Sequence, residues 1–408
     1  MRLREKLWFR PLVSALLSVL AAFAAMLADG FAAELNLPEI KPDSLESLLS
    51  VISASMLGIA VFAVGAMISA YASATTAATP RSFPLVLRDD VSQNALSAFI
   101  GAFIFSIVAQ VALQNGVYGR PGRFVLFVIT LGVFALVILR FVGWVDRIAR
   151  LGRMGNTVDR VETATARALQ RHAFEPLLGG VPLAAPLSGP AVPPQRVGYV
   201  QDVDLACLQK IAQRLNTRIH VAARPGRFVA PGSALAQVDC ATLTEDDARA
   251  IQAAFAIGGD RTFDADPRFG LIVLSEISSR ALSPAVNDPG TAIDILGTLV
   301  RLFAGWAEAS AATPPAPPRF DRIAVPDLAL DDLLTDAFGG TLRDGAGCVE
   351  VAIHLQKALA ALTQMGHPAL ARAARDQADY ALSYAEASLK MPQEIEAVRA
   401  AAMAVGRV

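Results

Sequence analysis

The sequence has few charged residues for its length. Over 408 residues, charged residues make up 18% and hydrophobic residues 54%. Soluble domains usually contain about 25% charged and about 45–50% apolar residues. This chain therefore has more apolar residues than a soluble domain needs, and they must belong to some other kind of structure. The formal net charge of -1 also argues against a nucleic-acid-binding protein, because such proteins normally carry a basic face.

Cysteine is equally scarce. Cys207, Cys240 and Cys348 lie far apart and form no CxxC pair, so neither a disulfide framework nor a thiolate zinc site is predicted. We expect them to be small buried side chains in a reducing compartment. The histidines are scattered, and none pairs with another at helical metal-ligand spacing.

The motifs of common enzyme chemistry are also missing. There is no GxSxG elbow, no P-loop and no GxGxxG after a predicted strand. Asp260, Asp264, Asp266 and Asp288, with Glu276 nearby, match no calcium-loop spacing, and aspartate equally favours turns and helix caps. We therefore expect neither an enzyme nor a bound metal or other cofactor.

Long apolar runs are abundant, and nearly all of them lie in residues 1–150. Four runs approach the roughly 20 apolar residues that cross a bilayer. They cover about 11–28, 48–74, 95–113 and 124–145. This pattern predicts a multi-pass protein of the lipid bilayer with four transmembrane helices.

Basic residues concentrate at the two ends of this region, which an even number of spans places on one side. They are Arg2, Arg4, Lys6, Arg10, Arg147, Arg150 and Arg153. The loop after the first run is acidic, while Arg120 and Arg123 in the third loop depart from the pattern. The distribution predicts a bacterial inner-membrane protein with both termini in the cytoplasm.

The second run is unusually rich in small and hydroxyl residues, and these recur every seven positions. The candidate pore-lining or helix-packing residues are Ser55, Gly58, Phe62, Gly65, Ser69, Ala72 and Thr76. Small residues let helices pack closely, and a small polar face also leaves room for water and ions. Both interpretations stay open. The helix is also long enough for its end to project beyond the bilayer.

The rest of the chain predicts a soluble region in several parts. Residues 151–195 form a helical extension and a proline-rich linker, and residues 196–310 a mixed α+β domain. A second linker at 311–320 precedes a helical region at 321–408. Within the α+β domain, the order strand, short helix, strand, turn, strand is predicted over 198–239.

The phrase RPGRFVAPGSALAQV in this domain resembles half of a barrel-sandwich hybrid, the small β fold of biotinyl and lipoyl domains. It lacks the modifiable lysine at the expected hairpin. The resemblance therefore implies a structural module and not a covalent carrier.

Several helix starts can be predicted from local chemistry. Thr244 precedes an acidic first turn, Pro267 begins another helix, and Asp288 is expected to cap a helix that begins at Pro289. The segment RTFDADPRFG…ALSPAVNDPGTA is the most distinctive one. Its candidate ligand or interface residues are Asp264, Asp266, Asn287 and Asp288.

Two sequence segments resemble those of a known protein family. TPRSFPLVLRDDVSQNALSAFIGAF and RALSPAVNDPGTA, together with the apolar runs, resemble the domain-of-unknown-function 2254 family of bacterial membrane proteins. The resemblance covers nearly the whole chain. It implies the membrane topology and no catalytic residue.

The predicted fold is an α-helical membrane protein with a mixed α+β cytoplasmic region, which contains a small β module and a C-terminal helical bundle. The leading functional hypothesis is a homo-oligomeric ion channel or transport-related protein. The alternative is a membrane-anchored sensor or scaffold that binds a cytoplasmic partner or a small ligand.

Overall fold

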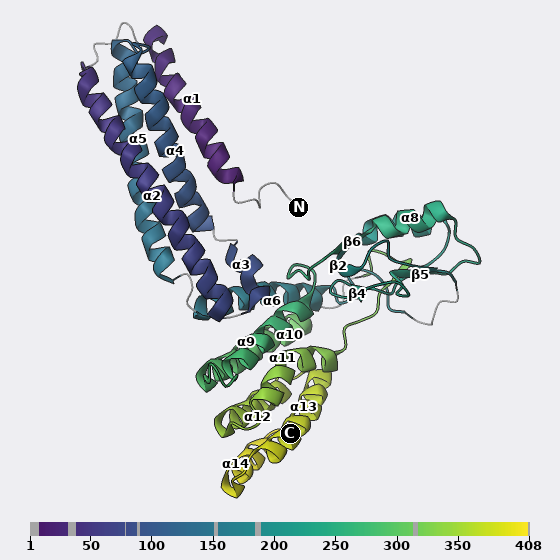
Figure 1. Ribbon diagram of the computed structural model, residues 1–408. Helices are drawn as coiled ribbons and strands as arrows, with labels where there is room; N and C mark the ends of the chain where they lie inside the picture. The colour runs from purple at the N-terminus through teal and green to yellow at the C-terminus, as the bar shows by residue number, and fades with distance from the viewer. Residues whose placement is uncertain are drawn as a thin grey trace. The chain divides into compact units, whose positions relative to one another are not determined.

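The computed structural model of the protein describes residues 8–31, 38–77, 79–87, 90–150, 154–183, 189–312 and 317–406. The chain divides into two compact units, Met1–Thr157 and Val158–Val408. Figure 1 shows a first unit built only of helices and a second that combines strands with helices.

Four helices of the first unit are long and apolar enough to cross a membrane. They are α1 (Phe9–Phe31), α2 (Pro42–Ala77), α4 (Asp90–Gln114) and α5 (Arg120–Arg150), with a 3-10 turn (Pro80–Ser82) and the short α3 (Phe83–Leu87) after α2. The four predicted helices are therefore confirmed, and each extends beyond its predicted bounds. Helix α2 continues past the apolar span that ends at Ala72 and is about 54 Å long at 1.5 Å per residue.

Helix α4 packs against the other three long helices. Gly101 of α4 allows the closest approach, because an added Cβ there would meet the hydroxyls of Ser14 and Ser18 on α1. Toward α4, helix α2 presents a buried apolar face at the three- and four-residue spacing of a helix-packing seam. The buried residues of this face are Leu49, Ile52, Met56, Ala60 and Ala63.

Polar contacts tie the helix ends together. Arg10 at the start of α1 pairs with Asp90 at the start of α4, with a 2.5 Å separation between Nη2 and Oδ1. At the other end, Arg120 of α5 pairs with Glu39 at 3.1 Å. The helices thus alternate in direction, and α1 begins at the same end of the unit at which α5 finishes (Figure 1).

The second unit contains two small sheets. Their orders are β1-β5-β3-β7 and β4-β2-β6. The strands are β1 (Ala191–Val192), β2 (Gly198–Val203), β3 (Ile219–Val221), β4 (Phe228–Val229), β5 (Ala236–Val238), β6 (Phe255–Gly258) and β7 (Ile323–Ala324). All neighbouring strands are antiparallel except β3 and β7.

Two short helices accompany the strands, α7 (Leu205–Arg214) and α8 (Glu245–Ala253). The predicted order of strand, helix, strand, turn and strand over 198–239 is confirmed. Val200, Leu208 and Ile219 are fully buried in one apolar core that also includes residues of both sheets. Thr244 caps α8 as predicted, since its hydroxyl accepts from the Asp247 N–H at 3.2 Å.

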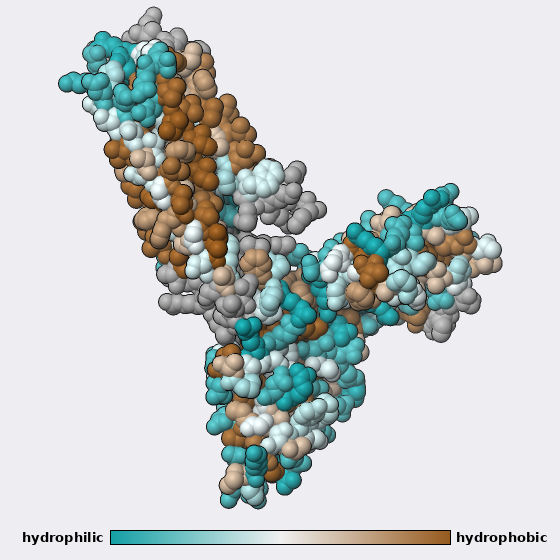
Figure 2. Space-filling view, viewed as in Figure 1, coloured by the Kyte–Doolittle hydropathy of each residue, from teal (hydrophilic) through white to brown (hydrophobic). Residues whose placement is uncertain are grey.

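The remaining helices form a bundle. They are α6 (Met154–Phe174), α9 (Pro267–Ala281), α10 (Pro289–Ala312), α11 (Leu330–Asp344), α12 (Val349–Thr363), α13 (Pro368–Ser388) and α14 (Pro392–Ala402). Helices α9 and α10 pack against α11 and α12, and β7 pairs with β3. The predicted linker at 311–320 therefore does not divide the second unit into separately packed domains. In Figure 2, hydrophilic residues are frequent on the visible face of this unit, whereas apolar residues cover much of the four-helix unit.

Asp288 was predicted to cap the start of α10, and the structure confirms this cap. Its carboxylate accepts from the Thr291 N–H at 3.0 Å and from the Thr291 hydroxyl at 2.6 Å, and these bonds lower its pKa. Replacing it with alanine should cost about 1 kcal/mol, which corresponds to about 2–4 °C in the melting temperature of a unit of this size. Asp294→Ala, on the exposed side of the same helix, is the control and should change stability by less than about 0.5 kcal/mol.

The same contact has a defined pH dependence. Because the folded pKa lies below the unfolded value of about 3.9, the stabilisation is present above that value and is lost as the pH falls through the folded pKa. The difference between wild type and Asp288→Ala should therefore shrink on acidification. A difference that stays constant down to pH ~3, below the unfolded value, would show that the carboxylate is not the cap.

Candidate functional site

Six of the seven candidate residues of α2 lie on an exposed face of the helix. Ser55, Gly58, Phe62, Gly65, Ser69 and Ala72 are all exposed, opposite the face that packs on α4. At Gly58 and Gly65, no atom lies within 4 Å of an added Cβ. We call these six residues the outward stripe. The side chain of Thr76, predicted with them, lies outside the described residues.

The outward stripe differs from the exposed faces of α1 and α5, although α2 also exposes Val51, Leu57, Val61 and Ile68. On α1 the exposed side chains include Leu16, Leu20 and Phe23, and on α5 they include Leu139 and Val142. Such large aliphatic and aromatic side chains are typical of a lipid-facing surface. The outward stripe carries only one large side chain, Phe62, whose ring packs edge-on to Trp144 at 6.2 Å. Apart from this Phe62 contact, the residues of the outward stripe therefore lie outside the packing of the chain's own bundle, whereas Ala60 and Ala63 of α2 are buried in it.

The four candidate residues of the soluble region do not form one site. Asp264 and Asp266 precede α9, whereas Asn287 and Asp288 follow it, and α9 is about 22 Å long. Asn287 has a left-handed backbone with φ 51°, which asparagine tolerates, and Asp288 caps α10. The second pair therefore builds a turn between helices. Asp264 is exposed on the wall of a cavity described below.

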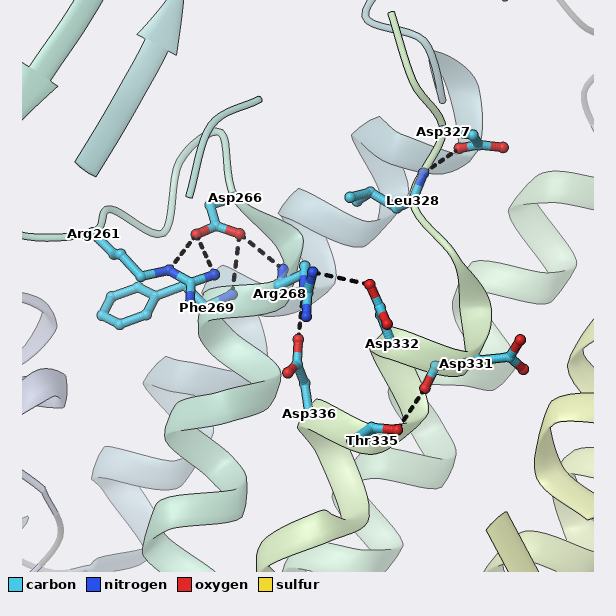
Figure 3. Close-up of polar contacts among 10 residues, drawn as sticks. All are labelled: Arg261, Asp266, Arg268, Phe269, Asp327, Leu328, Asp331, Asp332, Thr335 and Asp336. Atoms are coloured by element: carbon cyan, nitrogen blue, oxygen red, sulfur yellow. Dashed lines mark hydrogen bonds and ion pairs between the residues drawn. The ribbon is translucent and has the colours of Figure 1, made fainter. Parts of the chain in front are cut away.

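Asp266 is the buried centre of a charged cluster (Figure 3). It is 2% exposed, accepts from the backbone N–H groups of Arg268 and Phe269, and pairs with Arg261 at 2.7 Å. Burial raises the pKa of its carboxyl, although Arg261 and the two N–H groups act in the opposite direction. The predicted helix start at Pro267 is confirmed, and Asp266 is its cap.

Arg268 extends this cluster to α11. Its guanidinium binds Asp336 at 2.6 Å and Asp332 at 3.2 Å, and the Asp336 hydrogen bond raises the pKa of Arg268. Figure 3 shows Arg268 between the two carboxylates. The cluster therefore holds the start of α9 against α11.

Gly226 makes room for the Asp266 carboxylate. It has φ 92°, and an added Cβ would collide with the carboxylate oxygens of Asp266. Gly232 has the same φ with nothing within 4 Å, so it is a matched control. Gly232→Ala should cost only the backbone strain of about 1–3 kcal/mol, and Gly226→Ala should cost a further ~1–3 kcal/mol from the collision. Equal melting temperatures for the two variants would contradict this close approach.

A cavity of about 1020 Å³ opens beside the cluster, between the end of α6 and the start of α7. Its walls include His172, Asp204, Arg224, Asp264 and Arg319. A second cavity of about 570 Å³ shares His172 and Arg319 and is bounded by Trp306 and His367. Both volumes fall in the range of small-molecule sites, about 300–1,000 Å³, or close to it.

His172 lies between these two cavities. Its side chain is 6% exposed, and its Nδ1 accepts from the indole N–H of Trp306 at 3.3 Å. That bond places the ring proton of neutral His172 on Nε2, which lies 3.5 Å from Asp327 Oδ1. Burial raises the pKa of Asp327, but His172, the Leu328 N–H and Arg224 together bring it below its ordinary value.

Sequence reasoning missed His172, Arg224 and Arg261. None of the three is among the candidate site residues that the sequence predicts. Among the described residues, no group of three or more His, Cys, Asp or Glu side chains is arranged to hold a metal ion. The arginine-rich phrase from Arg224 to Arg227 was the one available signal.

Four apolar helices followed by a mixed second unit define a class of helical membrane protein with a large extramembrane part. The chain belongs to the DUF2254 family, described as "Predicted membrane protein", whose model matches residues 4–361. The family resemblance carried by the sequence is thus confirmed.

Two curated relatives that the chain resembles carry the name of uncharacterized proteins. The uncharacterized protein Rv1290c of Mycobacterium tuberculosis is 26% identical over 279 residues, which covers 62% of this chain and 51% of the relative. The uncharacterized protein Mb1321c of Mycobacterium bovis matches with the same values. The chain therefore spans about half the length of the curated relatives it matches. No solved structure matches the chain, so the barrel-sandwich resemblance stays a prediction.

Proposed function

We propose that the protein is a homo-oligomeric channel or transport-related protein of the bacterial inner membrane. The outward stripe of α2 packs against neighbouring copies beside a central path. The observation that carries the proposal is that α2 exposes small and hydroxyl residues on one face. A different face of the same helix is buried against α4. A stripe of this kind suits close helix–helix contact or a water-filled path better than contact with lipid tails.

The contact between α1 and α4 supports the proposal that small residues of α2 contact a neighbouring copy. Where α1 and α4 approach most closely, Gly101 faces two serines. Gly58 and Gly65 offer the same kind of surface without an occupant from the same chain. A neighbouring copy of α2 is therefore the occupant that fits.

The polar helix ends support cytoplasmic termini. Arg120 and Arg123 are the basic residues that depart from this orientation, and Arg120 is paired with Glu39 at 3.1 Å. The basic residues at the two ends of the membrane region outnumber those of the third loop and favour a cytoplasmic location for both termini and for the second unit. We also propose that the protein is not an enzyme, because its charged clusters are engaged in caps and ion pairs.

Ion flux into liposomes tests the channel proposal. Gly65→Leu and Ser69→Leu fill the outward stripe and should abolish flux of the purified protein. Val64→Leu is the matched control, since Val64 is exposed but lies about 100° around the helix from Gly65. Unchanged flux in both stripe variants would contradict the proposal, as would the same loss in Val64→Leu.

A second candidate function is a membrane-anchored sensor or scaffold. The cavity of about 1020 Å³ favours it, because a mixed charged and apolar lining suits a small ligand. A wild-type protein that shows no flux under voltage, tension or pH steps would favour this candidate over the channel.

A further inference from the structure

A third cavity of the second unit has four arginines among its twelve lining residues. It has a volume of about 420 Å³ and lies between the Arg224–Arg227 turn, the start of α9 and the start of α11. Its charged walls are Arg224, Arg227, Arg261, Arg268, Asp327 and Asp332. Arg261 is paired with the buried Asp266, and Arg268 is paired with Asp332 and Asp336. The positive charge that remains on the walls comes from Arg224 and Arg227, with Asp327 as the remaining carboxylate.

Arg224 is the most unusual of these residues, because it is 9% exposed and its described side-chain hydrogen bonds go only to carbonyls. Both Nη atoms donate to the Pro176 carbonyl at 3.0 Å, and Nη1 also donates to that of Pro326. No carboxylate of the described residues lies within ion-pair distance of it. A buried guanidinium without a direct counter-ion is costly, and an anion in the adjoining cavity would compensate it.

The turn that carries Arg224 also fixes Arg227. Pro225 and Gly226 are its central residues, and the Arg227 N–H donates to the Arg224 carbonyl at 3.1 Å. Arg227 is exposed, and its guanidinium forms no hydrogen bond or ion pair within the described chain. The turn thus presents two arginines, one buried and one solvent-accessible, to the same cavity.

Helix α11 adds a second positive feature to the cavity. Its N-cap residue, Ala329, has no side chain that can accept from the first-turn N–H groups, and Leu328 and Ala329 both line the cavity. An uncapped helix N-terminus favours anions. Asp331 and Asp332 in the first turn oppose this, although Arg372 pairs with Asp331 and Arg268 with Asp332, each at 3.2 Å.

We propose that this cavity binds a phosphate group of a small molecule, held by Arg224 and Arg227 against the start of α11. Arginine binds phosphate through paired N–H groups, and a volume of about 420 Å³ accommodates a phosphorylated metabolite or a lipid headgroup. The inference gives the sensor candidate a ligand class. It does not rest on the channel proposal, because it concerns residues of the second unit alone.

Calorimetric titration of the full-length protein in detergent with pyrophosphate, at constant ionic strength, tests the site. Wild type should bind saturably, and Arg227→Gln should weaken binding by about tenfold, the loss of one charge-assisted hydrogen bond. The Arg227 guanidinium forms no hydrogen bond or ion pair with another side chain of the described residues, so this variant should fold. Arg218→Gln, an exposed arginine outside the cavity, is the control and should bind like wild type.

A short-chain phosphatidic acid, titrated in parallel, separates the two phosphate sources. Binding of pyrophosphate indicates a soluble phosphate ligand, and binding of the lipid alone indicates a lipid headgroup. In both cases Arg227→Gln must weaken the binding that wild type shows. No binding of either probe would overturn the proposal. Equal weakening by Arg218→Gln and Arg227→Gln would also overturn it, because it would reveal only nonspecific attraction.

Discussion

Replacing Asp266 with alanine should destabilise the second unit by about 3–5 kcal/mol, the usual cost of breaking a buried ion pair. Three losses combine in this variant. The cap of α9 and the ion pair with Arg261 at 2.7 Å are removed, and the buried Arg261 guanidinium loses its counter-ion. The Arg261 side chain is only 17% exposed and would be left without its partner. Thermal unfolding of the full-length protein measures the effect.

Asp260→Ala is the control for this prediction, because Asp260 is exposed a few residues earlier. It should change stability by less than about 0.5 kcal/mol. The double variant Asp266→Ala with Arg261→Ala should recover part of the loss, since no unpaired buried charge remains. A loss below about 1 kcal/mol for Asp266→Ala would mean that the carboxylate serves only as a cap.

Replacing Phe338 with alanine should cost about 3–5 kcal/mol through a cavity in the helical bundle. Phe338 of α11 is fully buried and stacks on Phe303 of α10, with ring centroids 6.1 Å apart. This contact joins helices on either side of the predicted linker at 311–320. The loss should therefore lower the melting temperature of the whole second unit and not of residues 321–408 alone.

Phe228→Ala provides the comparison on an exposed aromatic residue. Phe228 is 52% exposed and contacts Tyr199 with a ring separation of 5.1 Å. Loss of that pair should cost about 0.5–1.5 kcal/mol. Two separate unfolding transitions in Phe338→Ala, with only one shifted, would contradict a single packed second unit.

Local features of this fold could be predicted from the sequence. Four apolar runs were sufficient to identify the long helices, and Asp288 with Pro289 was sufficient to place the start of α10. Each of these depends on neighbouring residues only, because span length and capping are local properties. Their boundaries were less accurate, as the longer α2 shows.

Contacts between distant segments could not be predicted. The carbonyls that bind Arg224 are 48 and 102 residues away, and the partner of Arg268 at Asp336 is 68 residues away. The seven-residue repeat of α2 was visible, yet nothing local showed that its small face is turned away from α4. That orientation depends on contacts with distant residues, because Ile52, Ala60 and Ala63 of α2 pack in one apolar cluster with residues of α4 and α5.

Cysteine cross-linking in native membranes tests the central claim that the outward stripe contacts another copy of the chain. Cys207, Cys240 and Cys348 are first replaced with serine, and single cysteines are then introduced at Gly65, Ser69 or Val64. A short thiol-reactive cross-linker should join copies through positions 65 and 69 and leave the Val64→Cys variant monomeric on denaturing gels. Cross-linking through Val64 alone, or through none of the three, would contradict the account.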